Sequence, residues 1–177
     1  MRGRFALIAL LAALPGCSLH PLYAGGGSGA VAQALHGVQV GPIQGRAGWL
    51  VRTALEDRFG RGGGDVVYRL EVELDDNITG FGIRADDAVT RERRTLRARY
   101  RLVDAARGTV LLDATAGSDA GVDVVSSEYA TVAAEQTALE HLAITIADQI
   151  VSRVALYASR GGRPPAVPPA TGSPAAQ

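Results

Sequence analysis

Two stretches of the chain alternate apolar and polar residues, which is the pattern of strands with one buried and one solvated face. Residues 68–74 and 95–102 both place apolar side chains at even positions and charged or polar ones at odd positions. A short strand is predicted at 38–40, and a more apolar one at 109–116, after a turn at 104–108. The last three strands therefore form a predicted antiparallel meander, with a polar, glycine-containing connection over 75–87.

Two other stretches repeat apolar residues every three or four positions, as amphipathic helices do. The first covers residues 46–59 and stops at Gly60. The second runs from about 127 to 158, with its apolar stripe at Val132, Leu139, Leu142, Ala143, Ile146, Ile150, Val154 and Tyr157. The element order β-α-β-β-β-α predicts an α+β fold, with two helices packed on one face of a four-stranded mixed sheet.

The ends of the chain differ in composition from this predicted domain, which spans residues 37–158. Residues 1–16 have a basic start and a short apolar run, as a signal peptide does, and the run is too short to cross a bilayer as a helix. Residues 17–36 contain a glycine-rich tether, and residues 159–177 form a Pro/Ala-rich tail that we expect to be disordered.

Cys17, the only cysteine, follows the apolar run directly in the sequence Leu14-Pro15-Gly16-Cys17. This stretch resembles the bacterial lipobox, in which the cysteine is acylated and becomes the new N-terminus, although Pro15 departs from the usual residue. Several acyl chains anchor a soluble domain stably, because each buried CH₂ contributes about 0.8 kcal/mol. The other interpretation is a small residue in a cleaved segment, where a free thiol would be a liability. In such lipoproteins, Asp directly after the cysteine usually marks retention in the inner membrane. Because residue 18 is Ser, the resemblance implies sorting to the outer membrane.

Composition and motifs give no support to an enzyme, a metal site or a cofactor. The chain has 177 residues with 18 basic and 18 acidic side chains, so it lacks the positive charge typical of nucleic-acid binders. None of its three histidines, His20, His36 and His141, has another ligand at zinc-binding spacing. The glycines at 60–64 lack the ending of a phosphate loop.

Arginines concentrate on the 95–102 strand and on the residues before it. The odd-numbered ones project from one strand face; they are Arg91, Arg93, Arg97, Arg99 and Arg101. Cross-strand ion pairs could account for two of them, if Leu74 lies opposite Leu96 so that Glu73 faces Arg97 and Glu71 faces Arg99. Arg91, Arg93 and Arg94 lie beyond those acids. Guanidinium groups bind phosphate and carboxylate well, so the candidate anion site comprises Arg91, Arg93, Arg94 and Arg97.

The residues after the cysteine, Cys17-Ser18-Leu19-His20-Pro21-Leu22-Tyr23, carry a family resemblance. They resemble the Cys-Gly-Phe-x-Pro-Leu-Tyr opening of the LPS-assembly lipoprotein family (LptE), especially its alphaproteobacterial forms, with departures at Ser18 and Leu19. Later features agree in order, including the 38–40 strand, the pattern over 94–104 and Tyr129-Ala130 at the start of the last helix.

The resemblance implies a non-enzymatic, periplasm-facing outer-membrane lipoprotein. Family members plug a large outer-membrane β-barrel translocon and bind lipopolysaccharide (LPS) during its delivery to the cell surface. The expected partners are this barrel, LPS and the membrane through the N-terminal lipid. The main alternative is an auxiliary lipoprotein that acts as an adaptor for an ABC-type lipid transporter; a lipid-anchored enzyme ranks below both.

Overall fold

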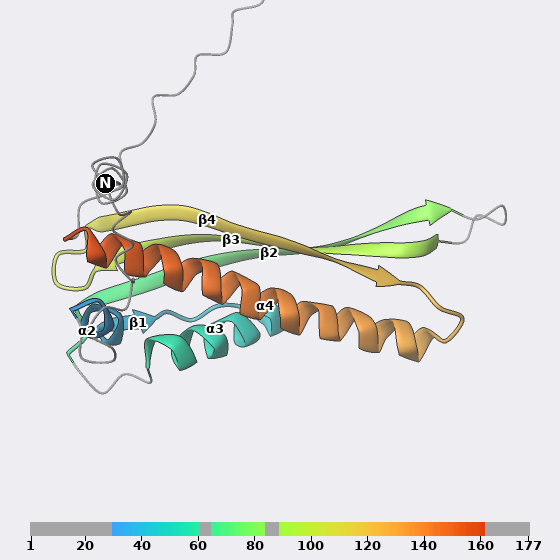
Figure 1. Ribbon diagram of the computed structural model, residues 1–177, viewed down its shortest axis with the longest axis horizontal. Coiled ribbons are helices and arrows are strands. Elements are labelled where there is room, and N and C mark those ends of the chain that lie inside the picture. Colours follow the sequence, from blue (N-terminus) through green and yellow to red (C-terminus); the bar gives the residue numbers. More distant parts are fainter. Residues whose placement is uncertain (1–29, 61–64, 84–88, 162–177) are drawn as a thin grey trace, which may run out of the picture.

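Three long antiparallel strands and one long helix run along the molecule and give it an elongated shape (Figure 1). The computed structural model describes residues 30–60, 65–83 and 89–161. Its elements, in chain order, are α2 (Ala30–His36), β1 (Val38–Val40), α3 (Gly45–Phe59), β2 (Tyr68–Ile83), β3 (Val89–Asp104), β4 (Val110–Asp123) and α4 (Glu128–Ser159).

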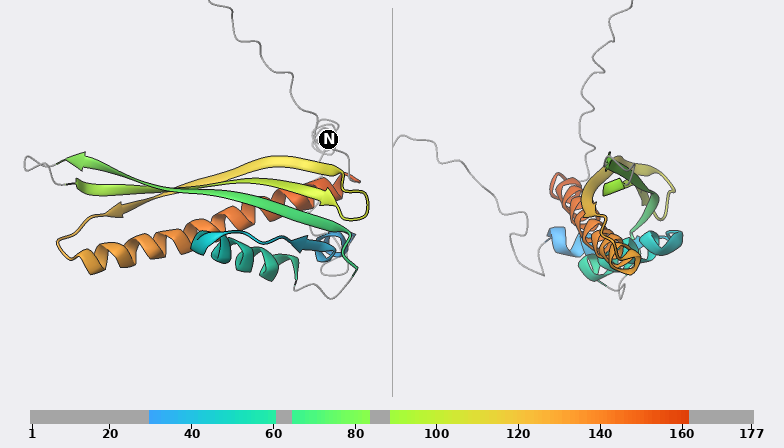
Figure 2. Two further views of the ribbon diagram at one scale, coloured as in Figure 1. Left: turned by 180° about the vertical axis from the view of Figure 1, so that it is seen from behind. Right: turned by 90° about the vertical axis from the view of Figure 1, so that its right-hand side faces the viewer.

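The strands form one mixed sheet in the order β1-β2-β3-β4. The short β1 pairs with β2 in parallel, and the other pairs are antiparallel. Seen end-on, the sheet curls over the helices and leaves its other face uncovered (Figure 2). The α+β fold, with helices on one face of a four-stranded mixed sheet, is therefore confirmed.

The even-numbered side chains of β2 and β3 form the sheet side of the core, as their alternation predicted. Leu70, Leu96 and Leu102 are at most 1% exposed. They belong to one apolar cluster with the predicted stripe of α4 from Leu139 to Tyr157 and with Val51, Leu55 and Phe59 of α3. Burying each such side chain contributes roughly 1.5–3 kcal/mol, so this layer stabilises the fold. Val132, which the stripe included, is instead exposed near the start of α4.

Helix α4 begins at a capped N-terminus, where the Ser127 hydroxyl accepts a hydrogen bond from the Ala130 amide. Its length and composition would allow it to cross a membrane, but half of its most apolar window is buried inside this domain. The core helix of a soluble domain passes the same test.

A short helix, α2, occupies the end of the 17–36 range that the sequence indicated as a tether. It packs against α4, and its Leu35 belongs to the core. Gly60, at the end of α3, has a positive φ of 87°, and a Cβ there would lie 2.7 Å from Nδ1 of His36. The close approach of α2 to the end of α3 therefore requires glycine at position 60.

The strands are longer than the alternation alone predicted. β2 continues to Ile83, through most of the expected 75–87 connection, and β4 continues to Asp123. The predicted register of β2 on β3 was wrong by two residues, because Leu74 lies opposite Ala98 and Glu73 opposite Arg99. Because the shift is an even number of residues, each side chain still projects from the predicted face of the sheet.

Candidate functional site

The candidate site is the sheet face that the helices leave open. Arg91, Arg93, Arg97 and Arg99 of β3 are exposed there, while Arg101 is partly buried. Arg94, an even-numbered residue, projects from the opposite face toward α4. The arginine cluster that the sequence placed together is thus divided between the two faces.

Two of the open-face arginines are held by acids on neighbouring strands. Arg99 donates to both carboxylate oxygens of Asp113 on β4, at 3.3 and 2.9 Å. This hydrogen-bonded contact raises the pKa of Arg99 and lowers the pKa of Asp113. Arg101 lies 3.2 Å from Glu71 and 3.9 Å from Glu73. The expected pairs Glu73–Arg97 and Glu71–Arg99 do not form, because the register is shifted and Asp113 binds Arg99 instead.

Acidic partners also reach the arginines nearer the hairpin end, where the sequence suggested none. Arg91 Nε lies 2.8 Å from Asp123 of β4. Arg94 donates to both carboxylate oxygens of Asp76 at 2.9 and 2.6 Å, and to the backbone oxygen of Glu135 on α4 at 3.0 Å. The hydrogen bonds that Arg94 donates to Asp76 raise the pKa of Arg94 above its ordinary value. Arg94 therefore ties the β2–β3 hairpin to α4.

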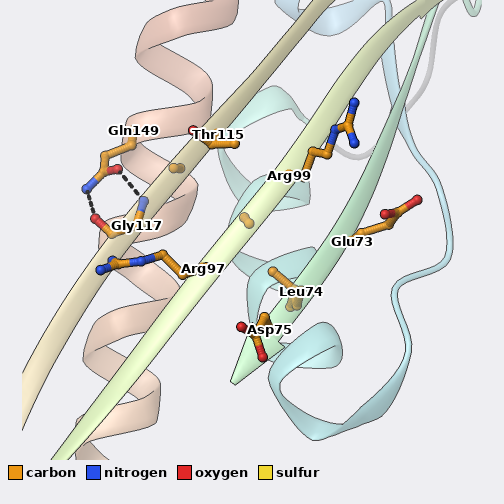
Figure 3. Close-up of a pocket in the computed structure, with 10 residues that line it drawn as sticks. Glu73, Leu74, Asp75, Arg97, Arg99, Thr115, Gly117 and Gln149 are labelled. Carbon is orange, nitrogen blue, oxygen red and sulfur yellow. Dashed lines mark hydrogen bonds between the residues drawn. The ribbon is translucent and has the colours of Figure 1, made fainter. Parts of the chain in front are cut away.

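The guanidinium groups of Arg93 and Arg97 make no ion pair with any described residue. Arg93 instead lies over the ring of Phe81, 5.3 Å from its centroid. Asp75 is the strand neighbour directly opposite Arg97, yet the Arg97 side chain extends toward Gly117 of β4 on its other side (Figure 3). Arg97 is thus a cation on the open face that forms no ion pair within the described ranges, although Asp75 and Glu73 line the same groove.

Arg97 lies flat against β4 because position 117 is glycine. A Cβ at Gly117 would be 2.4 Å from Nη1 and 2.8 Å from Cδ of Arg97. The other side of Gly117 is fixed by Gln149 of α4, whose amide accepts from the Gly117 N–H and donates to its carbonyl oxygen (Figure 3). Neither Gly117 nor Gln149 carried a signal in the sequence, since their contact joins positions 32 residues apart.

These residues border an open groove of about 650 Å³. Its polar lining includes Glu73, Asp75, Arg97, Arg99 and Thr115. The two acids and two arginines of this lining balance in charge, but Arg99 is paired with Asp113, whereas Arg97 makes no ion pair with a described residue and lies in the same groove as the Thr115 hydroxyl. An exposed guanidinium of this kind can bind a phosphate or carboxylate through paired hydrogen bonds. Among residues 30–60, 65–83 and 89–161, no group of three or more His, Cys, Asp or Glu side chains could hold a metal ion. Cys17 lies outside the described residues.

Comparison with known families supplies a match over most of the domain. The family model described as "LptE: Lipopolysaccharide-assembly" matches residues 35–154. A comparison with curated proteins finds no match.

Solved structures share the fold. A crystal structure assigned as a lipoprotein from Caulobacter crescentus is 25% identical, with a TM-score of 0.62, and the alignment covers 75% of this chain and 98% of that one. The rare lipoprotein B of Shewanella oneidensis is 10% identical, with a TM-score of 0.54 and coverage of 70% and 96%. A lipoprotein B from Nitrosomonas europaea is 15% identical, with a TM-score of 0.54 and coverage of 70% and 85%. The similarity to the last two structures, at 10% and 15% identity, shows a shared fold only.

Proposed function

Because the chain belongs to the LptE family of lipopolysaccharide-assembly proteins, we propose that it plugs the LPS-export β-barrel of the outer membrane and binds LPS during its insertion at the cell surface. The observation that carries this proposal is the family match over residues 35–154, which spans the whole sheet and nearly all of α4. A role in LPS assembly is the family's common property; the barrel contact, the LPS contact and the outer-membrane location are the proposed steps.

The open sheet face is the proposed LPS-binding surface. Arg97 would contact a phosphate of the LPS head group, because it is the arginine of the groove that forms no ion pair with any residue the structure describes, whereas Arg99 is paired with Asp113. Arg91 and Arg93 extend the same face toward the hairpin end. Arg94, the remaining candidate, would act indirectly by holding the hairpin on α4.

An acyl chain on Cys17 would anchor the protein in the outer membrane. The glycine-rich residues 25–29 would separate this anchor from α2. Mass spectrometry of the N-terminal peptide tests the attachment, with Cys17→Ser as the control. An unmodified Cys17 in a soluble periplasmic pool would contradict the proposed anchor.

The barrel partnership is tested by affinity purification of the tagged chain from solubilised outer membranes. We expect a stoichiometric complex with the LPS-export barrel. Recovery of ABC-transporter subunits without a barrel would instead support the adaptor function.

LPS binding is tested with the purified Cys17→Ser chain and LPS in a direct binding assay. We expect Arg97→Ala to weaken LPS binding about tenfold. This change corresponds to the loss of one charge-assisted contact that contributes about 1.4 kcal/mol. Arg46→Ala, which removes an exposed arginine from α3, is the matched control and should leave binding unchanged. Equal effects of the two substitutions would show that only overall charge matters.

A further inference from the structure

An apolar groove lies at the end of the domain where α2 and the C-terminus of α4 meet, and it shares no lining residue with the groove that contains Arg97. It has a volume of about 230 Å³. Its lining residues are Ala34, Tyr68, Leu102, Val154, Tyr157, Ala158 and Gly161. None of these side chains is charged. The groove therefore suits an apolar segment that brings no charge with it.

The sequence contains such a segment a short distance before α2. Residues 18–29 include no Asp, Glu, Lys or Arg, and Pro21-Leu22-Tyr23 combines a fixed backbone φ with two large apolar side chains. The proposed function uses Cys17 and the open sheet face but assigns no role to this motif. We propose that Pro21-Leu22-Tyr23 docks intramolecularly into the groove.

The length of the intervening chain permits this contact. Six residues, 24–29, separate Tyr23 from Ala30, the first residue of α2, and an extended chain of six residues spans about 20 Å. Ala34 in the groove wall lies one helical turn beyond Ala30, about 6 Å along the axis. Because the segment is already tethered beside the groove, it binds at a high effective concentration.

The C-terminal tail also starts at the groove, since Gly161 is part of its wall. The tail is a poorer occupant. Arg163 comes two residues after Gly161, and Val167 is the only branched aliphatic residue of 162–177. Leu22 and Tyr23 bury more apolar surface than the prolines and alanines of the tail, and Tyr23 can pack edge-to-face against Tyr68 or Tyr157.

Docking would change how the domain sits relative to its anchor. With residues 21–23 bound, three residues separate Cys17 from the domain, so the groove end is held within about 14 Å of the acylated cysteine. Without docking, the thirteen steps from Cys17 to Ala30 allow about 45 Å. The motif would thus convert a long tether into a short one and orient the groove end toward the membrane.

Disulfide trapping tests the contact in the mature chain with Cys17→Ser, which removes the only native thiol. One variant carries Leu22→Cys with Ala158→Cys at the groove. The control carries Leu22→Cys with Val132→Cys, an exposed position about 39 Å further along α4. We expect the 22–158 disulfide to form at least tenfold faster than the 22–132 disulfide under mild oxidation. Equal rates would overturn the proposal.

Hydrogen exchange of the same Cys17→Ser chain, without introduced cysteines, provides an independent measurement. The amides of Leu22 and Tyr23 should exchange more slowly than those of Gly25–Gly27, and Leu22→Ser with Tyr23→Ser should abolish this protection. Truncation after Gly161 should leave it unchanged. Protection at Ala166 and Val167, with none at Leu22 and Tyr23, would assign the groove to the tail and refute the proposal. Because Cys17 is absent, neither result depends on acylation or on LPS binding.

Discussion

The side chain of Gln149 on α4 binds both outward-facing backbone groups of Gly117 on β4, accepting from its N–H at 3.1 Å and donating to its carbonyl at 3.2 Å. β4 is an edge strand, and free edge groups invite pairing with another chain. Helix α4 therefore covers the edge of the sheet at Gly117, the residue that the Arg97 side chain also contacts.

Replacing Gln149 by Ala should destabilise the domain by about 1 kcal/mol, because two partly solvated hydrogen bonds are lost. The exposed edge should also increase self-association at high protein concentration. Urea denaturation and size-exclusion chromatography measure the two effects. Gln136→Ala, on an exposed turn of the same helix, is the control and should change neither.

Gly117→Ala should displace Arg97 without unfolding the domain. The new Cβ would overlap Nη1 and Cδ of Arg97, and a long arginine side chain can move away. We expect LPS binding to weaken about as much as in Arg97→Ala, with a change below about 1 kcal/mol in the free energy of unfolding. Gly121→Ala lies on the same strand with no atom within 4 Å of the added Cβ. If both glycine substitutions weakened binding equally, the position of Arg97 would be irrelevant.

Arg94 and Arg91 should differ strongly in their contribution to stability. The Arg94 side chain is only 13% exposed, and removing it leaves Asp76 unpaired, so Arg94→Ala should cost about 2 kcal/mol. The Arg91–Asp123 pair is 63% and 72% exposed, and Arg91→Ala should cost less than about 0.5 kcal/mol. Thermal and urea unfolding compare the two variants. A large loss in Arg91→Ala would contradict this ranking.

Glu92 should make stability fall as pH rises. Burial, together with the hydrogen bond and negative charge of Glu135, raises the pKa of Glu92 above its unfolded value of 4.5. The folded state thus binds the Glu92 proton more tightly than the unfolded state does. The resulting stabilisation of the domain is complete below pH 4.5, and it is lost as the pH rises through the pKa of Glu92 in the folded state. Glu92→Gln should remove this pH dependence and be more stable than the parent protein at neutral pH. Unfolding curves from pH 4 to 8 test both expectations, and an unchanged profile would exclude Glu92 as the cause.

Periodicity predicted the element types, because the contacts that define them are local. The two-residue period placed Leu70 and Leu102 in the core and Arg97 on the open face, and the structure agrees on each. The three- and four-residue spacing located α3 and α4 for the same reason. The extension of β2 beyond Leu74 was missed, because Asp75, Asp76 and Asn77 interrupt the apolar pattern although the backbone pairing continues.

What the sequence determined by itself is therefore which face each side chain takes, since neighbouring residues of a strand must alternate. It also placed the lone cysteine and the Pro-Leu-Tyr motif before the domain. Only the tertiary structure decided which charges meet. A shift of two residues preserves every face but exchanges every partner, so Glu73 lies opposite Arg99, and Asp75 lies opposite Arg97 without forming an ion pair with it. The contact of Gln149 with Gly117 likewise depends on how α4 crosses the sheet, which no local pattern encodes.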